Sequence, residues 1–370
     1  MAIARPQSGQ ELASSLADCA AQGRTIQLGG AFSKNRMAGP VEPADVVVST
    51  SALNQVLQYE PNDLTMSVGS GLPWAELTAT LAGNRQMIPL DPPFSAHATV
   101  GGVIASNSSG PRRRVYGTAR DMVIGMQFAT LEGKLINSGG MVVKNVAGLD
   151  MGKLLIGSFG TLAALVSVNF KLSPIPEACE TFVRSFQSAS EAFTLRDQVL
   201  AGALQPSALD ILNPPASARV GLEKWSLVVE ASGNAAAVAR YSSELGGADR
   251  APKNLLHRIQ EFVPAFLVDH PDGAVVRASS TLTAMKELMA GWQVPAFARA
   301  GSGVCYACFA DAREAAVPGG RGAVEFAPEE KKRELALWPA PGDDLAMMKR
   351  IKDMFDPKHL LNRGRLYGRI

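Results

Sequence analysis

The hydrophobic and polar positions of the first 175 residues predict helices and strands that alternate along the chain. Apolar residues recur at helical spacing behind Ser8 and Glu11, which have the S-x-x-E spacing of a capping box, and Gly23 ends this helix. A second helix begins at Pro73 and ends at Gly83. The predicted strands, which share short apolar runs, are 25–28, 46–49, 64–68, 122–130, 135–136 and 166–172. Helices and short strands of these lengths indicate an α/β or α+β unit.

Residues 180–330 show a different order of elements, β-α-β-β-α-β, which is typical of a small antiparallel sheet with helices on one face. Ser188 and Glu191 form another capping box, and Asn234 is predicted to cap an alanine-rich helix. The predicted strands of this part are 181–186, 208–212, 226–230 and 274–279. The segment 248–272 reads as a polar insertion without a predicted role.

Prolines divide the chain. Pro174, with a second proline two residues later, ends the last strand of the first part. We therefore predict an N-terminal domain (1–177), a cap (178–330) and a C-terminal segment (331–370) that returns to the N-terminal domain. A last helix, 343–355, is predicted in that segment, ahead of the tail FDPKHLLNRGRLYGRI.

Composition excludes several classes of function. Of the 370 residues, 46% are hydrophobic and 19% are charged, so the chain can bury a large core, and its net charge of +2 gives no reason to expect nucleic acid. No apolar run approaches the roughly 20 residues that span a bilayer, and the N-terminus lacks the apolar core of a signal peptide. We expect a cytoplasmic protein without a transmembrane segment. Four cysteines do not make a disulfide framework.

A glycine-rich loop, GGAFSK, follows the predicted strand 25–28. Gly29 and Gly30 allow successive backbone N–H groups to form a nest for a phosphate, to which Ser33 and Lys34 would add a hydroxyl group and a positive charge. An ordinary glycine turn is the alternative. Neither G-x-x-x-x-G-K-[ST] nor G-x-G-x-x-G occurs here, so the loop predicts neither a P-loop nor a Rossmann dinucleotide site.

A second segment of small residues reads LDPPFSAHATVGGVIASNSSG. Pro92 makes its entry stiff, Gly101 and Gly102 permit close approach of the backbone to a ligand, and Ser106 and Asn107 supply hydrogen-bonding groups. A buried helix of small residues packed against a sheet is the alternative.

Taken together, these segments resemble the FAD-binding domain of the vanillyl-alcohol-oxidase-like (PCMH-type) flavoproteins. The resemblance covers about 5–175 and 343–367. The matching elements are the Gly29-Gly30 loop, 59–77, Thr99 to Gly102 with Asn107 and Gly110, Tyr116-Gly117, 157–162 and FDPKHLLN. Within that family, GPRRRVYGTARDMVIG and GGMVVKNVAGLD look like the smaller FAD-domain (E) subunits of bacterial glycolate oxidases.

The resemblance implies an α+β fold, in which a PCMH-type FAD-binding domain of two α/β subdomains carries a smaller antiparallel α+β cap. It implies that the pyrophosphate of FAD is held by Gly29, Gly30, Ala31, Phe32, Ser33 and Lys34. The path to the isoalloxazine ring would be lined by Pro92, Thr99, Gly101, Gly102, Ser106, Asn107 and Gly110. The adenosine end would approach Gly157, Gly160 and the backbone of Val166, and Asn362 would approach the flavin from the tail.

Several positions depart from the family's usual residues. Residues 30–33 read Gly-Ala-Phe-Ser, without the His that holds flavin covalently in some relatives, so non-covalent FAD is expected. Leu149 stands where Tyr is usual, Gly152 where Ser or Thr is usual, and Arg363 where Pro is usual.

Oxidation of a 2-hydroxy acid requires a base for the hydroxyl proton and cations for the carboxylate. His97 is the best-placed base among the four histidines, although a solvated loop histidine is the alternative. Lys144 is expected beside the flavin ring, where its charge would stabilise reduced flavin, the alternative being a surface lysine. Arg277 and Arg299 are candidate carboxylate clamps in the cap.

Two further motifs contain residue types that can bind ligands. The run Arg112 to Arg114 could meet a flavin phosphate, a substrate carboxylate or an acidic partner, or lie in a solvated turn. Cys305 and Cys308 lie in a strand-like alternation, which places them on opposite faces and argues against a metal site, so no metal is expected.

The resemblance implies FAD-dependent oxidation of glycolate to glyoxylate within a complex. The partners of this chain would be a second FAD-containing subunit and an iron–sulfur subunit that passes electrons onward. The chain would be cytoplasmic, or held at the inner membrane through these partners. Two alternatives stay open. One is a stand-alone FAD dehydrogenase for another 2-hydroxy acid or alcohol, and the other is a structural subunit that keeps the flavin fold without chemistry.

Overall fold

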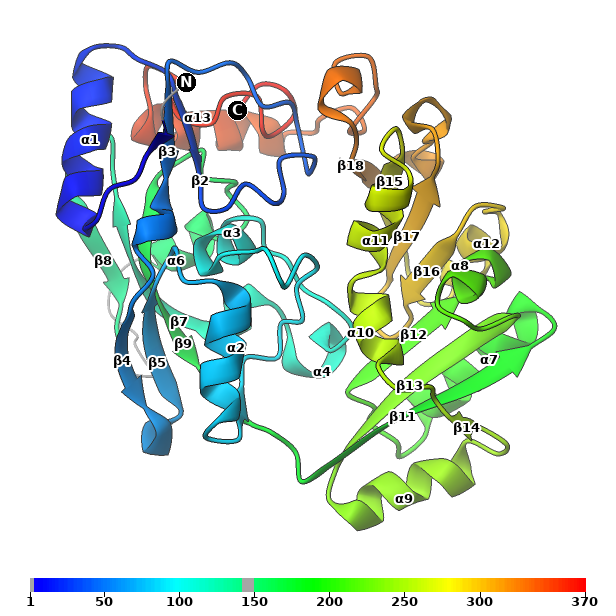
Figure 1. Cartoon of the computed structure of the whole chain (residues 1–370). Helices are drawn as coiled ribbons and strands as arrows, with labels where there is room; N and C mark the ends of the chain where they lie inside the picture. The colour runs from blue at the N-terminus through cyan, green and yellow to red at the C-terminus, as the bar shows by residue number, and fades with distance from the viewer. Residues whose placement is uncertain (1–2, 142–149) are drawn as a thin grey trace.

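A computed structural model describes residues 3–141 and 150–370 of the chain. Two lobes lie side by side (Figure 1): an N-terminal lobe, residues 3–175, and a cap lobe, residues 178–326. The C-terminal segment crosses from the cap back to the N-terminal lobe. No helix within the described ranges has both the length and the apolar character required to cross a bilayer.

The N-terminal lobe is built on two main sheets. A parallel sheet of order β1-β3-β2 comprises β1 (Ile3–Ala4), β3 (Val46–Ser49) and β2 (Ile26–Gly29). An antiparallel sheet of order β4-β5-β9-β7-β8 comprises β4 (Val56–Glu60), β5 (Thr65–Gly69), β9 (Ala164–Lys171), β7 (Val123–Ala129) and β8 (Leu135–Gly139). A short ladder joins β6 (Gln86–Met87) to β10 (Ser173–Pro174). These are the two subdomains expected from the resemblance.

Helices of this lobe fill the space beside and between the two sheets. They are α1 (Gly9–Ala21), α2 (Trp74–Ala82), α3 (Val100–Ala105), α4 (Arg113–Tyr116), α5 (Ala119–Met122) and α6 (Met151–Leu155). Leu12 and Leu16 of α1 are buried in a cluster with residues of both sheets. Trp74 of α2 meets Phe170 of β9 edge to face, with ring centroids 6.4 Å apart, an arrangement that adds to area burial.

The cap lobe is one antiparallel sheet of order β14-β11-β13-β12-β16-β17-β15-β18. Its strands are β11 (Ala178–Phe186), β12 (Ala208–Leu212), β13 (Trp225–Gly233), β14 (Asp249–Arg250), β15 (Ala274–Ser279), β16 (Ala296–Arg299), β17 (Val304–Phe309) and β18 (Gly322–Phe326). Short 3-10 turns occur at 50–52, 61–63, 312–314, 318–320 and 329–331.

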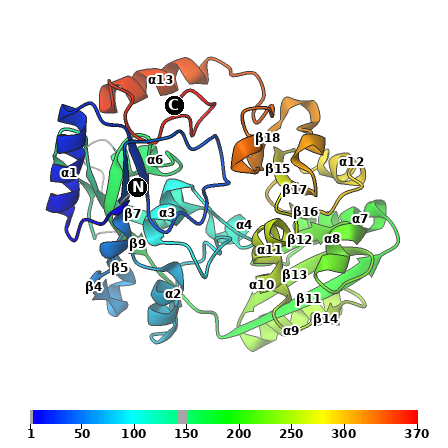
Figure 2. The ribbon, with the colours of Figure 1, turned by 45° about the horizontal axis from the view of Figure 1, so that its top comes forward.

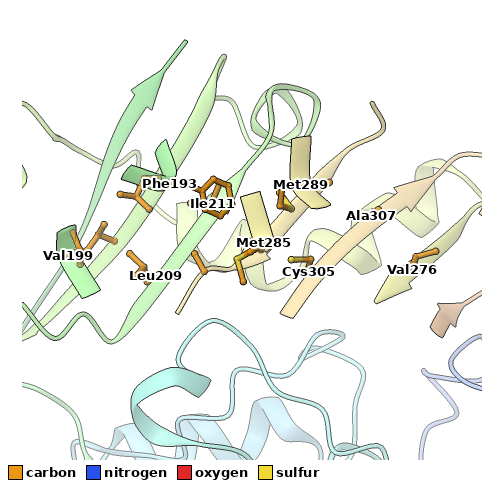
Figure 3. Packing of buried hydrophobic residues seen from close by; sticks show 14 of the residues in the cluster. Phe193, Val199, Leu209, Ile211, Val276, Met285, Met289, Cys305 and Ala307 are labelled. Atoms are coloured by element: carbon orange, nitrogen blue, oxygen red, sulfur yellow. The ribbon is translucent and has the colours of Figure 1, made fainter. Parts of the chain in front are cut away.

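Helices cover both faces of the cap sheet, so the prediction of helices on one face was wrong. One face packs against α7 (Ala189–Ala201), α9 (Ala235–Glu244) and α12 (Met285–Ala290), and Figure 3 shows Phe193, Met285 and Cys305 among the buried side chains there. The other face packs against α8 (Pro214–Arg219), α10 (Leu255–Gln260) and α11 (Phe262–Asp269).

The prediction that 248–272 is a polar insertion was also wrong. The segment contains β14, α10 and α11, and most of its large apolar residues are buried in the core of the cap, although Val268 is exposed. The buried residues are Leu255, Ile259, Phe262, Val263, Phe266 and Leu267. Glu261 at the junction of the two helices accepts hydrogen bonds from the backbone N–H groups of Phe94 and Ser95, so the segment also contacts the N-terminal lobe.

Most other predicted elements are confirmed. β3, β12 and β15 have the predicted bounds, and the Ser188–Glu191 capping box at α7 is present with both of its hydrogen bonds. At α1 the Ser8 hydroxyl accepts from the Glu11 N–H, whereas the Glu11 carboxylate accepts from Gln7 instead of Ser8. β4, β16 and β18 were not predicted.

The last helix, α13 (Asp344–Phe355), packs on the N-terminal lobe (Figure 2). Beyond it, the N–H of Ile26 donates to Leu360 O (2.8 Å), which joins the tail to β2. Lys352, fully buried, pairs with Asp356 at 2.7 Å and donates to two carbonyl groups, while Asp356 accepts from the N–H groups of Leu360 and Leu361. A buried ion pair with this many hydrogen bonds fixes the tail in place.

Arg112 joins the two lobes. Its guanidinium donates to both carboxylate oxygens of Glu230 in β13, at 2.8 and 2.6 Å, and to Asp91 of its own lobe at 2.9 Å. Arg114 donates to the Gln205 side chain of the cap at 3.0 Å. Two of the three arginines in this run therefore contact the cap of the same chain.

Candidate functional site

The first candidate site is a pocket in the N-terminal lobe, here called the loop pocket, with about 870 Å³ of space when its opening to solvent is included. It lies between the loop after β2, the start of α3, the turn before β9 and the C-terminal tail. The sequence-predicted residues that line it are Gly29, Gly30, Ala31, Phe32, Ser33, Lys34, Thr99, Gly101, Gly102, Ser106, Gly160 and Asn362.

Two close approaches explain why glycine occupies key positions of this pocket. A Cβ atom at Gly30 would lie 2.0 Å from Thr99 Oγ1, and one at Gly101 would lie 2.9 Å from Ser70 Cβ. Thr99 itself caps α3, because its hydroxyl accepts from the Gly102 N–H at 3.3 Å. The loop after β2 and the start of α3 can therefore face each other across the pocket only without these side chains.

The loop 31–34 can bind an anion through its backbone. Within residues 3–141 and 150–370, no acceptor engages the N–H groups of these four residues, and Phe32 adopts a left-handed φ of 55°. Lys332 and Arg365 hold the other side of the loop, where both donate to the carbonyl oxygens of Asn35 (2.8 and 3.1 Å) and Gly39 (3.1 and 3.0 Å). These cations bind the carbonyl groups and leave the N–H groups for a ligand.

Lys34 brings a positive charge to the same loop, where its amine lies over the Phe94 ring at 5.9 Å from the centroid. Its Nζ is buried and has no hydrogen-bond partner among the described residues. Burial lowers the pKa of Lys34 to about 8, against the attraction of the Glu261 carboxylate. A buried cation without a partner is costly unless an anion neutralises it. The pyrophosphate of FAD fits this combination of a free amine, free N–H groups and glycine clearance.

Asn362 lines the loop pocket, but its side chain holds protein backbone. Its Oδ1 accepts from the Leu28 N–H (2.7 Å), and its Nδ2 donates to Leu28 O (2.9 Å) and Phe159 O (2.8 Å). The tail therefore ties β2 to the turn before β9, and Asn362 shapes the pocket wall. Sequence reasoning missed other wall residues, among them Thr50, Ser70, Phe159 and Arg365.

Other predicted residues lie outside the loop pocket. The carbonyl of Pro92 accepts a hydrogen bond from the Gln260 side chain at 3.0 Å. The N–H of Gly110 donates to Leu90 O, and the carbonyl of Val166 accepts from the Ser70 N–H. His97 is exposed and lines a separate groove together with His257. Lys144 lies outside the described residues. The structure thus does not bring His97 together with Arg277.

The second candidate site is a pocket between the lobes, here called the arginine pocket, with about 980 Å³ of space when its opening to solvent is included. Ser106 and Phe159 line both pockets, so the two spaces adjoin. Asn107 and Gly157, predicted near FAD, also line it. Its charged and phenolic residues come from five elements: Arg113 of α4, Arg277 of β15, Arg299 of β16, Tyr306 of β17 and Glu325 of β18.

The electrostatics of the arginine pocket favour an anion. Arg299 pairs with the buried Asp210 at 2.6 Å, and burial raises the pKa of Asp210 to about 6 against the pull of Arg299. Arg277 Nε lies 3.9 Å from Glu325 Oε1. Arg113 carries no ion pair with any described residue. Three guanidinium groups therefore outnumber the carboxylates around them, and planar Arg donors match a carboxylate ligand.

The cysteine motif is structural in the described chain. Cys305 and Cys308 in β17 are fully buried on opposite faces of the cap sheet, as predicted. Burial raises the pKa of both thiols, that of Cys305 to about 12. Among residues 3–141 and 150–370, no group of three His, Cys, Asp or Glu side chains could hold a metal ion.

Comparison with known protein families gives two matches. Residues 1–139 match the FAD binding domain, and residues 330–366 match the C-terminal domain of FAD linked oxidases. The second match contains Lys332 and Arg365, which hold the loop at 31–34 from behind.

Similar proteins include two glycolate oxidase subunits. GlcD of Bacillus subtilis (strain 168) is 25% identical over 422 residues, covering 100% of this chain and 89% of GlcD. GlcE of Escherichia coli (strain K12) is 39% identical over 124 residues, which is 33% of this chain and 35% of GlcE. The D-lactate dehydrogenase of Archaeoglobus fulgidus is 29% identical over 234 residues, covering 60% of this chain and 52% of that enzyme.

Similar solved structures include alkyldihydroxyacetonephosphate synthase, with a TM-score of 0.74 at 18% identity over 97% of this chain and 75% of that chain. The 4-ethylphenol oxidase from Gulosibacter chungangensis gives a TM-score of 0.72 at 14% identity, covering 98% and 88%. These likenesses confirm the predicted α+β fold of PCMH type with its cap, and the family matches confirm FAD as the cofactor. The chain is thus an FAD-dependent oxidoreductase, with the FAD-binding domain and C-terminal domain of the FAD-linked oxidases and homology to glycolate oxidase subunits and 2-hydroxy acid dehydrogenases.

Proposed function

We propose that this chain oxidises a short 2-hydroxy acid, with glycolate as the first candidate, and that it works as the FAD-binding (E-type) subunit of a glycolate oxidase. The loop pocket would hold the pyrophosphate and adenosine of FAD, and the flavin ring would reach the arginine pocket through the shared wall at Ser106 and Phe159. Because no described wall residue of the loop pocket is His or Cys, we propose that FAD binds without a covalent bond.

The observation that carries this proposal is the set of three arginines beside the predicted flavin path. Arg113, Arg277 and Arg299 line one pocket together with Asn107 and Gly157, which the resemblance assigns to the FAD site. Bidentate Arg–carboxylate contacts fix both the position and the orientation of a small acid. A clamp of this kind would hold the carboxylate of a 2-hydroxy acid with its α-carbon toward the cofactor.

The protein's own residues would prepare the substrate for oxidation. When bound, FAD supplies the acceptor for the hydride from the α-carbon. Arg277 and Arg299 would hold the carboxylate from the cap, while Arg113 would approach it from the N-terminal lobe. The pocket lies between the two lobes, and displacement of water from it by the bound substrate would strengthen these charge interactions.

We further propose that the partners are a second FAD-containing subunit and an iron–sulfur subunit. Support comes from GlcD and GlcE, both of which are named as subunits of glycolate oxidase. The buried, high-pKa cysteines of β17 are unsuited to a cluster, so an electron-transfer centre would belong to another chain. The complex would lie in the cytoplasm or be held at the inner membrane by those partners.

The first test is the absorption spectrum of the purified chain between about 350 and 500 nm, recorded before and after anaerobic addition of glycolate, D-lactate or D-2-hydroxyglutarate. Flavin bands that bleach with a 2-hydroxy acid support the proposal. Bands that persist even in the assembled complex favour a subunit without chemistry, and turnover of the isolated chain with an artificial acceptor favours a stand-alone dehydrogenase.

Arg277→Met tests the clamp directly. Because Arg277 has no ion pair closer than 3.9 Å, its removal leaves no tightly paired charge behind. We expect the substrate concentration for half-maximal flavin reduction to rise about 10- to 100-fold, which corresponds to the loss of a charged hydrogen bond. Flavin content should not change. Arg240→Met, in the exposed pair with Glu244 on α9, is the control and should leave both quantities unchanged.

A further inference from the structure

Glu325 occupies an irregular position in the cap sheet. Along the β15–β18 ladder Val275 pairs with Phe326 and Val276 pairs with Val324, so Glu325 has no partner residue on β15. The irregularity is a β-bulge, in which one strand carries an extra residue. Bulges of this kind redirect a side chain, and Glu325 lines the arginine pocket while Val324 is buried in the core of the opposite face.

The backbone fixes Glu325 relative to the cofactor loop. The carbonyl of Glu325 accepts from the Ala38 N–H at 2.8 Å, and Phe326 forms an isolated bridge with Met37. Ala38 follows the anion-binding loop 31–34 by four residues. The bulged strand of the cap therefore has a fixed place against the lobe that would hold FAD.

The arginine pocket needs a proton acceptor, and few of its side chains qualify. Among the described residues that line it, Glu325 is the one carboxylate, and none is a histidine. Arginine stays protonated in proteins. Burial raises the pKa of the Tyr306 phenol, so Tyr306 stays protonated near neutral pH. Glu325 is therefore the group with a lone pair available for a proton.

We propose that Glu325 is the general base for the 2-hydroxy acid, a role that rests on the proposed function. Glu325 takes the hydroxyl proton onto a carboxylate oxygen as the C–O bond of the substrate becomes C=O. The α-carbon loses its hydrogen with the bonding electron pair, as hydride, to FAD. The 2-oxo acid leaves, the substrate has lost two electrons and FAD has gained them, and the proton passes from Glu325 to solvent.

The charges around Glu325 suit this role. Arg277 of β15, Arg113 of α4, Arg299 of β16 and Tyr306 of β17 face the same pocket. Burial raises the pKa of Glu325, and the positive charges of Arg277 and Arg113 oppose that rise. A base works best when its pKa lies near the working pH, so a raised carboxylate pKa improves its match to neutral conditions.

The test compares the full-length, FAD-loaded wild type with Glu325→Gln, Glu325→Asp and the control Glu180→Gln. Glu180 lies on β11 and pairs with the exposed Arg250, away from both pockets. Rapid anaerobic mixing gives the rate of flavin reduction by the 2-hydroxy acid that reduces the wild type, at several pH values. Titration with oxalate, followed by the flavin spectrum, gives anion affinity independently of turnover.

For Glu325→Gln we expect the reduction rate at saturating substrate to fall at least about 100-fold and to lose its rise with pH. Flavin content should stay at the wild-type level. Oxalate affinity should fall with rising pH in the wild type, because ionised Glu325 repels the anion, and should be independent of pH in Glu325→Gln. Glu325→Asp should recover part of the rate, and Glu180→Gln should match the wild type throughout.

Three results would overturn the proposal, and they differ from one another. A Glu325→Gln variant with the wild-type rate and pH profile would show that another group takes the proton. If Glu325→Gln lost oxalate binding but kept the wild-type rate of flavin reduction at saturating substrate, Glu325 would be a residue that positions Arg277 and not the base. A wild type whose flavin no 2-hydroxy acid reduces would remove the proposed function and the base together.

Discussion

The loop pocket and the arginine pocket differ in how the chain builds them. The loop pocket takes most of its walls from contiguous segments, 27–35 and 99–106, and would contact its ligand largely through backbone that glycine leaves uncovered. The arginine pocket takes its charged and phenolic side chains one at a time from four successive strands of the cap, β15 to β18, and from α4 of the other lobe. A pocket that contacts its ligand through the backbone can be recognised from a short glycine-rich sequence pattern. A pocket lined by side chains from several strands depends on how those strands pair, which a short pattern does not show.

Arg112→Met tests whether the loop pocket can keep its cofactor when the contact between the two lobes is broken. Of all the proposed substitutions, it should lower the free energy of unfolding most. Arg112 links Asp91 to Glu230, which is 2% exposed, so its loss leaves two carboxylates without their cation. We expect the free energy of unfolding in urea to fall by about 3–5 kcal/mol, as for other broken buried pairs. Because the loop pocket lies outside the cap, the folded variant should retain FAD while its reduction by substrate slows.

The control for this change is Arg240→Met, which breaks an exposed pair on α9 and should cost no more than about 0.5 kcal/mol. An Arg112→Met protein as stable as the control would mean that the lobes are held together without this ion pair. Loss of FAD together with the substrate response would mean that the two pockets are not separable.

Local signals explain which elements could be predicted. The caps at Ser188 and Asn234, and the apolar runs of β12 and β15, are complete within a few residues, so the sequence alone defined these elements. α10 and α11 were missed because each spans only six to eight residues between charged side chains. Their apolar residues do recur at helical spacing across both helices, a signal that extends beyond either helix alone.

Gly30→Ala breaks the loop pocket and leaves the arginine pocket intact. The new Cβ would lie 2.0 Å from Thr99 Oγ1, so either the loop or the start of α3 must move. Overpacking of this kind costs about 1–3 kcal/mol, which corresponds to a loss of roughly 5- to 150-fold in FAD affinity. The measurement is a fluorescence titration of apoprotein with FAD.

Gly83→Ala is the matched control, because its Cβ would meet nothing closer than 3.4 Å and its φ of −57° suits any residue. It should bind FAD as tightly as the wild type. Equal affinity in Gly30→Ala would show that the loop does not contact the cofactor closely. Circular dichroism of both apoproteins tests whether the change is confined to binding.

The sequence predicted the loop pocket, where backbone contact dominates, more completely than the arginine pocket. The residues from Gly29 to Lys34, together with Thr99, Gly101 and Gly102, were predicted to bind FAD, and the structure places them together in the wall of the loop pocket. Arg277 was predicted as a clamp, but Glu325 was not predicted, because a bulge that redirects a side chain depends on the pairing of two strands. Lys332 and Arg365 were missed for a related reason, since they act on the loop from behind, across about 300 residues of chain.

The smallest predicted effect concerns the charge of Lys34. Burial lowers the pKa of the Lys34 amine to about 8. A pyrophosphate oxygen beside the amine would raise that pKa, so FAD would bind the protonated form more tightly and binding would take up a proton. FAD affinity is therefore nearly constant well below pH 8 and falls as the pH rises above 8, by roughly tenfold between pH 7 and 9 if the pKa of Lys34 in the complex exceeds 9.5.

Calorimetric titrations of apoprotein with FAD in two buffers of different ionisation enthalpy measure this proton uptake. Uptake should be near zero at pH 7 and approach one proton near pH 9, whereas Lys34→Met should take up none at either pH and should bind more weakly at pH 7. An equal slope of affinity against pH in Lys34→Met would assign the proton to another group. That result would leave the backbone N–H groups as the main anion contact, and would sharpen the contrast between a pocket made of backbone and one made of charged side chains.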